Sequence, residues 1–129
     1  MMRPDVRTVA SHTTVARFRM AFPLGSTSYV VALNEDKNYA GIVNVPEAHA
    51  VELDESTSVR DILHFPDTTL SPAMTVKEAV TIFESSEAEV LAVIQSFENR
   101  HVVGLLTEAY ALRRYSEELD RRRRELLGD

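Results

Sequence analysis

Apolar residues follow two kinds of pattern along this chain, and the two kinds alternate in a fixed order. Helical spacing links Val15, Phe18 and Phe22, after a threonine that is suited to cap a helix. Two runs of β-branched and apolar residues come next, and the polar turn between them predicts a hairpin. Pro46 then fits the first turn of a short helix. The predicted β-α-β-β-α elements span residues 6–9, 13–22, 28–33, 39–43 and 46–50.

The same order returns in the second half of the chain. The stretch from Thr14 to Val43 is repeated, with changes, as Thr75 to Leu106, at a spacing of 61 residues that becomes 63 at Gly41 and Gly104. A unit this small cannot bury its apolar face alone, so we expect the two copies to pack against each other. The second set of elements is predicted at residues 68–70, 75–84, 90–94, 102–106 and 107–127.

These patterns predict an α/β fold with two β-α-β-β-α units in a pseudo-two-fold arrangement, plus a long C-terminal helix. The chain has 129 residues, which is enough for one shared core. We divide it into a first repeat at 1–51, a linker with a short helix at 52–63, and a second repeat with the C-terminal helix at 64–129.

The C-terminal helix has more apolar surface than one small repeat can cover. Leu112, Tyr115, Leu119 and Leu126 form a narrow stripe, and oppositely charged residues four apart lie opposite it. We expect the far end of the stripe to pack on another chain or domain, and we expect a homodimer.

Composition excludes several classes of protein. The net charge is −6 and the isoelectric point is near 5.2, which argues against binding to nucleic acid. The chain has no cysteine, so it has no disulfide framework. No apolar run approaches the roughly 20 residues of a membrane span. We therefore expect a soluble chain, either free or as the soluble part of a larger protein.

No residue pattern predicts catalysis or metal binding. The histidines lack the spacing of a metal site, no serine lies in a nucleophile motif, and the arginines at 121–124 alternate with nearby acids as on a solvated helix face. We therefore expect no catalytic residue, no metal and no enzyme activity. The four histidines are His12, His49, His64 and His101.

The repeated element order resembles a tandem pair of CBS (cystathionine-β-synthase) domains, also called a Bateman module. The resemblance is carried by the hairpins and by two segments, Gly41–Glu47 and Gly104–Tyr110. The family pattern in these segments is glycine, two apolar residues, serine or threonine, two variable residues and aspartate. The resemblance implies a regulatory module and covers essentially the whole chain.

A narrower resemblance is to the cytoplasmic CBS pair of bacterial ClC-type chloride channels. It is carried by residues 19–29, by Ser58–Pro72 between the repeats and by the arginine-rich tail at 112–124. It implies a module that joins two subunits and modulates gating, on the cytoplasmic side of the inner membrane and next to the membrane domain of a chloride channel or chloride/proton antiporter. Two alternatives stay open: a free-standing sensor of an adenosyl nucleotide that regulates a soluble enzyme, and a structural dimerisation module without a ligand.

The resemblance also implies a binding site for ATP or AMP in the cleft between the repeats, where the aspartate holds the ribose and the serine or threonine contacts phosphate. Here the first copy has Asn44 and Glu47 at these positions, and the second copy has Thr107 and Tyr110. One interpretation is an altered site with Thr107 across the cleft from Glu47 and Ser26 nearby as a donor. The other is that these residues are helix caps and first-turn residues, which needs no ligand.

Overall fold

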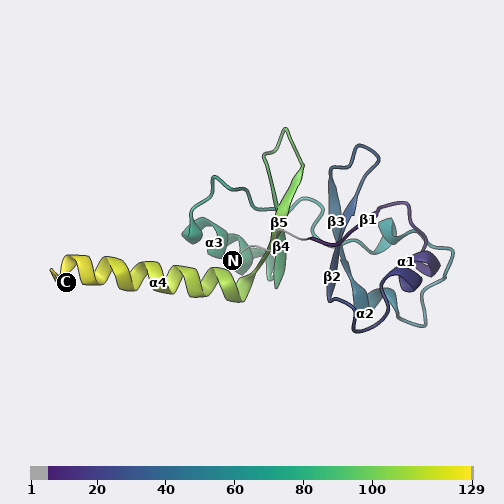
Figure 1. Ribbon diagram of the computed structural model, residues 1–129, viewed down its shortest axis with the longest axis horizontal. Coiled ribbons are helices and arrows are strands. Elements are labelled where there is room, and N and C mark those ends of the chain that lie inside the picture. Colours follow the sequence, from purple (N-terminus) through teal and green to yellow (C-terminus); the bar gives the residue numbers. More distant parts are fainter. Residues whose placement is uncertain (1–5, 129) are drawn as a thin grey trace.

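The computed structural model describes residues 6–128 and contains the predicted tandem repeat (Figure 1). The first repeat contains β1 (Thr8–Ala10), α1 (Val15–Ala21), β2 (Tyr29–Leu33), β3 (Tyr39–Asn44) and α2 (Val45–Ala48). A 3-10 turn, η1 (Val59–Ile62), precedes the second repeat. The second repeat contains α3 (Val76–Ser86), β4 (Val90–Ile94), β5 (Val102–Thr107) and α4 (Glu108–Leu126).

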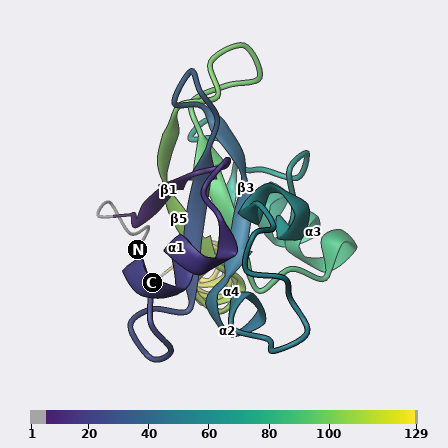
Figure 2. The same ribbon diagram turned by 90° about the vertical axis from the view of Figure 1, so that its right-hand side faces the viewer.

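The two sheets lie side by side at the centre of the molecule, with helices on their outer faces. One sheet has the order β1-β2-β3, and the other consists of β4 and β5. Helices α1 and α2 flank the first sheet, and α3 and the start of α4 flank the second (Figure 1). The tips of both hairpins point to the same end of the molecule in both views, and Figure 2 looks along α4.

The register of the strands follows the sequence repeat residue by residue. Val9 pairs in parallel with Ala32. Leu70 pairs in parallel with Val93, and both residues of this second pair lie 61 residues after their counterparts in the first. Both hairpins also have an irregularity at the same place, directly after Ala32 and directly after Val93. The duplication therefore preserved the local twist of the hairpin as well as its apolar pattern.

One predicted strand is shorter than expected. Residues 68–70 do not form a strand, and only Leu70 pairs, through a single bridge to Val93. Prolines at 66 and 72 flank this segment and provide no backbone N–H, which limits how far a ladder can extend. The predicted helical turn at 58–63 is the 3-10 turn η1.

The core has three layers of apolar side chains. One cluster lies between the first sheet and its helices around Phe18, and a second lies between the second sheet and its helices around Phe83. The third lies between the two sheets and draws residues from both repeats. Its buried members are Val31, Tyr39, Ile42, Val90, Ala92, Ile94 and Leu105. Neither sheet has its inner face covered without the other, as the repeat predicted.

The segment between the repeats packs closely against the first repeat. His64 pairs with Ile42 at the edge of β3, and Val59 is fully buried in the cluster around Phe18. The backbone N–H of Val15, at the start of α1, donates to the carbonyl of Thr57 at 2.7 Å. The division of the chain at residues 51 and 64 stays a prediction, since these contacts tie the linker to the repeat that precedes it.

A methyl group at Gly41 would collide with this segment. An ideal Cβ at Gly41 would lie 2.8 Å from Leu63 Cβ and 3.3 Å from the carbonyl oxygen of His64. We expect Gly41→Ala to lower the free energy of unfolding by about 1–3 kcal/mol, because the linker must move away from β3. Urea denaturation measures this loss. In a Leu63→Gly background, which removes the Cβ that the new methyl group would meet, the same substitution should cost clearly less, and an equal cost in both backgrounds would contradict this account.

Candidate functional site

Two clefts open between the repeats, and the repeat symmetry relates one to the other. Cleft A has a volume of about 520 Å³ and lies between residues 26–29 of the first repeat and the end of β5 with the start of α4. Cleft B has a volume of about 300 Å³ and lies between residues 87–90 of the second repeat and the end of β3 with the start of α2. Tyr29 and Val90, which are equivalent in the two repeats, line both clefts.

Tyr29 joins the two repeats at this point. Its hydroxyl donates a hydrogen bond to Glu89 Oε2 at 3.2 Å. Burial, the hydrogen bond to Glu89 and the negative charge of Glu89 all raise the pKa of Tyr29 above its ordinary value. The hydroxyl therefore stays protonated at neutral pH and acts as a donor between the clefts.

Cleft B is rich in carboxylates. Glu47, Glu87 and Glu89 line it. His64 Nε2 lies 3.0 Å from both carboxylate oxygens of Glu47, so the residue in the position of the family aspartate already has a partner. Asn44 Oδ1 accepts the backbone N–H of Glu47 at 3.1 Å and caps α2. Three carboxylates disfavour a phosphate group in this cleft.

Cleft A differs from cleft B in the charge of its lining residues. Hydroxyl groups of residues 26–28 and of Thr107 line it, together with the guanidinium of Arg113, and no carboxylate is among its lining residues. The Arg113 guanidinium carbon lies 5.4 Å from the centre of the Tyr110 ring, which is within range of a cation–π contact. One cation among neutral donors suits an anionic ligand.

Two of the hydroxyls in cleft A also have structural partners. Thr107 Oγ1 accepts the backbone N–H of Tyr110 at 3.2 Å and caps α4. Ser26 Oγ donates to the carbonyl of Pro23 at 2.6 Å. Each hydroxyl can form further hydrogen bonds, so these contacts orient it and still leave it able to bind a ligand.

The structure separates the four predicted site residues into two pairs. Asn44 and Glu47 line cleft B, whereas Ser26 and Thr107 line cleft A. The expected arrangement with Thr107 across one cleft from Glu47 is not found, because the internal symmetry places equivalent positions in opposite clefts. Whether any of the four binds a ligand stays a prediction.

Sequence reasoning missed Arg113 and the histidine next to Glu47. Arg113 lies three residues after Tyr110 and is therefore on the same face of α4, a signal that was present in the spacing. The contact between His64 and Glu47 spans 17 residues and depends on how the linker returns to β3, which no local pattern reveals.

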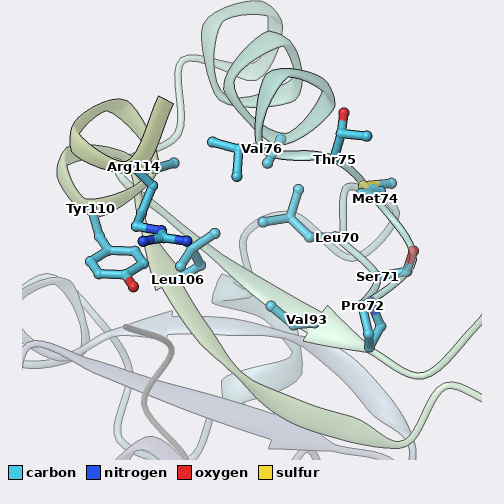
Figure 3. Close-up of a pocket in the computed structure, with 12 residues that line it drawn as sticks. Leu70, Ser71, Pro72, Met74, Thr75, Val76, Val93, Leu106, Tyr110 and Arg114 are labelled. Atoms are coloured by element: carbon cyan, nitrogen blue, oxygen red, sulfur yellow. The ribbon is translucent and has the colours of Figure 1, made fainter. Parts of the chain in front are cut away.

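A third, apolar pocket of about 170 Å³ lies within the second repeat, between α3, α4 and the sheet (Figure 3). Figure 3 shows Leu70, Val76 and Leu106 around it, with Tyr110 and Arg114 entering from α4. At the equivalent place in the first repeat, the fully buried Phe18 occupies the position of Ala79, and Val59 from the linker joins the same cluster. The two copies thus differ in side-chain size at this position.

Comparisons with known proteins agree with this architecture. The CBS domain family model matches residues 59–117. A CBS domain pair/ACT domain protein from Thermotoga maritima is 19% identical, with a TM-score of 0.70 over 92% of this chain and 94% of that one. The CBS pair of a protein described as a Mg²⁺ transporter of Shewanella oneidensis is also 19% identical, with a TM-score of 0.69 over 92% and 68% of the two chains.

A third similar structure is the CBS domains of a transcriptional regulator from Streptococcus pneumoniae. It is 14% identical, with a TM-score of 0.67 over 88% of this chain and 93% of that one. No curated protein matches the chain in sequence. The chain therefore has the fold of a CBS domain pair, and the match to the CBS family model lies in η1 and the second repeat. Within residues 6–128, no helix combines the length and the apolar composition that crossing a bilayer requires.

The apolar pocket predicts a stabilising substitution. Ala79→Phe copies the first repeat, where Phe18 fills the equivalent space, and should raise the free energy of unfolding by about 0.5–2 kcal/mol. Chemical denaturation with the wild-type chain alongside measures the gain. The matched control is Ala92→Phe between the two sheets, where the site is fully buried and overpacking should cost about 1–3 kcal/mol. Loss of stability in both variants would show that the pocket cannot accept a ring.

Proposed function

We propose that this chain is a regulatory CBS-pair module that binds an adenine nucleotide weakly in cleft A and carries out no chemistry itself. The observation that carries the proposal is the composition of cleft A, which combines Arg113 and Thr107 from the second repeat with hydroxyls of the first. A ligand bound there touches both repeats at once. Its binding free energy therefore depends on how the two repeats are arranged.

The mechanism is a shift of populations between arrangements of the repeats. A ligand that binds one arrangement more tightly increases its population by the ratio of the two affinities. In this proposal the two arrangements differ in how the side chains of the two repeats pack across the apolar layer between the sheets. A partner domain that contacts only one arrangement then senses the ligand.

The chemistry of the clefts favours one orientation of a nucleotide. Arg113 and the hydroxyls of cleft A suit the phosphates, whereas the carboxylates of cleft B disfavour them. Tyr110 replaces the aspartate of the family pattern, so the ribose lacks a carboxylate acceptor in cleft A. This loss is the reason we propose weak binding.

For the parent protein we propose a ClC-type chloride channel or chloride/proton antiporter. Residues 19–29 and Ser58–Pro72 support it, since both resemble the cytoplasmic CBS pair of that family. The module would then lie on the cytoplasmic side of the inner membrane as part of a dimer. The similar structures come from transport and regulatory proteins alike and do not single out this parent. The full reading frame tests it, because a ClC parent encodes many apolar segments of about 20 residues upstream.

A free-standing sensor that regulates a soluble enzyme is the second candidate. It is favoured by the similarity over nearly the full length of the CBS pair/ACT domain protein. Both candidates share the ligand site in cleft A, so nucleotide binding alone does not separate them. A reading frame without membrane segments would select the sensor.

Calorimetric titration with ATP, AMP and S-adenosylmethionine tests the site. We expect ATP to bind with a dissociation constant on the order of 100 μM, and Arg113→Glu to abolish the signal because it places a carboxylate against the phosphates. Arg114→Glu is the matched control. It makes the same change of charge at the next residue, but Arg114 lines the apolar pocket and not cleft A. A flat trace with all three ligands would refute nucleotide binding and leave the structural dimerisation module.

A further inference from the structure

The apolar pocket of the second repeat lies where the first repeat has an aromatic ring. Phe18 is fully buried there, in a cluster that also contains residues of β2, β3 and α2. Its equivalent Ala79 lines the pocket, together with the equivalents of three of those cluster members. The three pairs of equivalent residues are Ala32 and Val93, Val43 and Leu106, and Ala48 and Ala111. The same packing site is thus filled by a phenyl ring in one repeat and left open in the other.

The size of the pocket matches the ring that is missing. Its volume is about 170 Å³. An engineered apolar cavity of about 150 Å³ in another protein binds benzene. A hollow of this kind lowers the stability of a fold, because the atoms that line it lose packing contacts. A ligand with one aromatic ring restores those contacts in the way that Phe18 provides them in the first repeat.

The pocket has a buried end and an exposed end. Leu70 and Ala111 are each only 2% exposed, so they form the inner wall. Met74, Val76 and Tyr110 also line the pocket and are partly exposed, which places its mouth on their side. A small molecule can therefore enter without unfolding of the repeat, with its ring at the buried end and a polar group toward solvent.

A single charge lies at the exposed end. Arg114 is the only charged residue among the twelve that line the pocket, and Figure 3 shows its side chain entering from α4. Its Nη1 lies 3.5 Å from Glu117 Oε2, in a pair whose side chains are 53% and 57% exposed. Such a pair contributes little to stability, and the guanidinium has further N–H donors for a second acceptor. A carboxylate on the ligand matches the planar guanidinium in charge and geometry.

We propose that this pocket binds a small aromatic carboxylate, with its ring in the place that Phe18 occupies in the first repeat and its carboxylate paired with Arg114. The proposal rests on a ring-sized apolar hollow with one guanidinium at its exposed end. The pocket shares only Tyr110 with the lining of cleft A, so it is a second effector site beyond the proposed nucleotide site. Failure of nucleotide binding leaves this proposal standing, and the reverse holds as well.

Titration of the chain with phenylacetate, without nucleotide and followed by its amide and methyl NMR signals, tests the site. We expect shift changes at pocket residues such as Leu70 and Ala111, with a dissociation constant on the order of 0.5 mM. Phenylacetamide has nearly the same shape without the charge, and should bind about tenfold more weakly because it forms no charge-assisted pair. Unchanged pocket signals at about 10 mM phenylacetate would overturn the proposal, and so would equal affinity for the two compounds.

Two substitutions test the ring and the charge separately. Ala79→Phe places a ring of the chain itself in the pocket and should abolish binding of both compounds. Arg114→Gln should weaken phenylacetate about tenfold and leave the affinity for phenylacetamide unchanged, and its exposed position keeps this test valid even where Ala79→Phe does not fold. Arg121→Gln is the matched control, since it removes the same charge at an exposed position about two turns further along α4. Unchanged phenylacetate binding in Arg114→Gln would contradict the proposal.

Discussion

The contact between the inner faces of the two sheets is the constraint on which the rest of the molecule depends. The outer face of each sheet is covered by helices of its own repeat, but the inner-face side chains of β2 and β3, such as Val31 and Ile42, are buried against those of β4 and β5. That contact fixes the internal symmetry, and the symmetry in turn creates two clefts at its edges. The position of the clefts is thus a consequence of how a duplicated unit buries its surface.

Positions that are equivalent in the two repeats carry side chains of different charge in the two clefts. Where cleft B has Glu87 and Glu47, cleft A has Ser26 and Tyr110. The backbone scaffold tolerates this divergence, because the side chains at these positions point to solvent-filled space and do not contribute to the core. Symmetry of the fold therefore does not imply two equivalent ligand sites, and the electrostatic difference selects the cleft that suits an anion.

The fold could be predicted from the sequence because the signals that define it are local. The cap at Thr75, the apolar runs of the strands and the matched glycines all lie within a few residues of the element they specify. The site could be predicted only in part. Thr107 and Asn44 were found as residues, but their separation into different clefts depends on the symmetry, and the pairing of Glu47 with His64 depends on the path of the linker. Contacts between residues that are far apart in the chain produce no periodic pattern in the sequence.

The two extra residues of the second repeat lie beyond the shared irregularity in the hairpin, within the exposed turn that follows Ile94. This difference in length displaces no side chain of the apolar layer between the sheets, because the pairs from Val90 to Val93 keep the register of the first repeat. The same turn is thus a natural place for a fluorescent reporter or an epitope. Because it lies at the opposite end of the hairpin from the start of α4, a label there would report on the hairpins while leaving both clefts and the helix free.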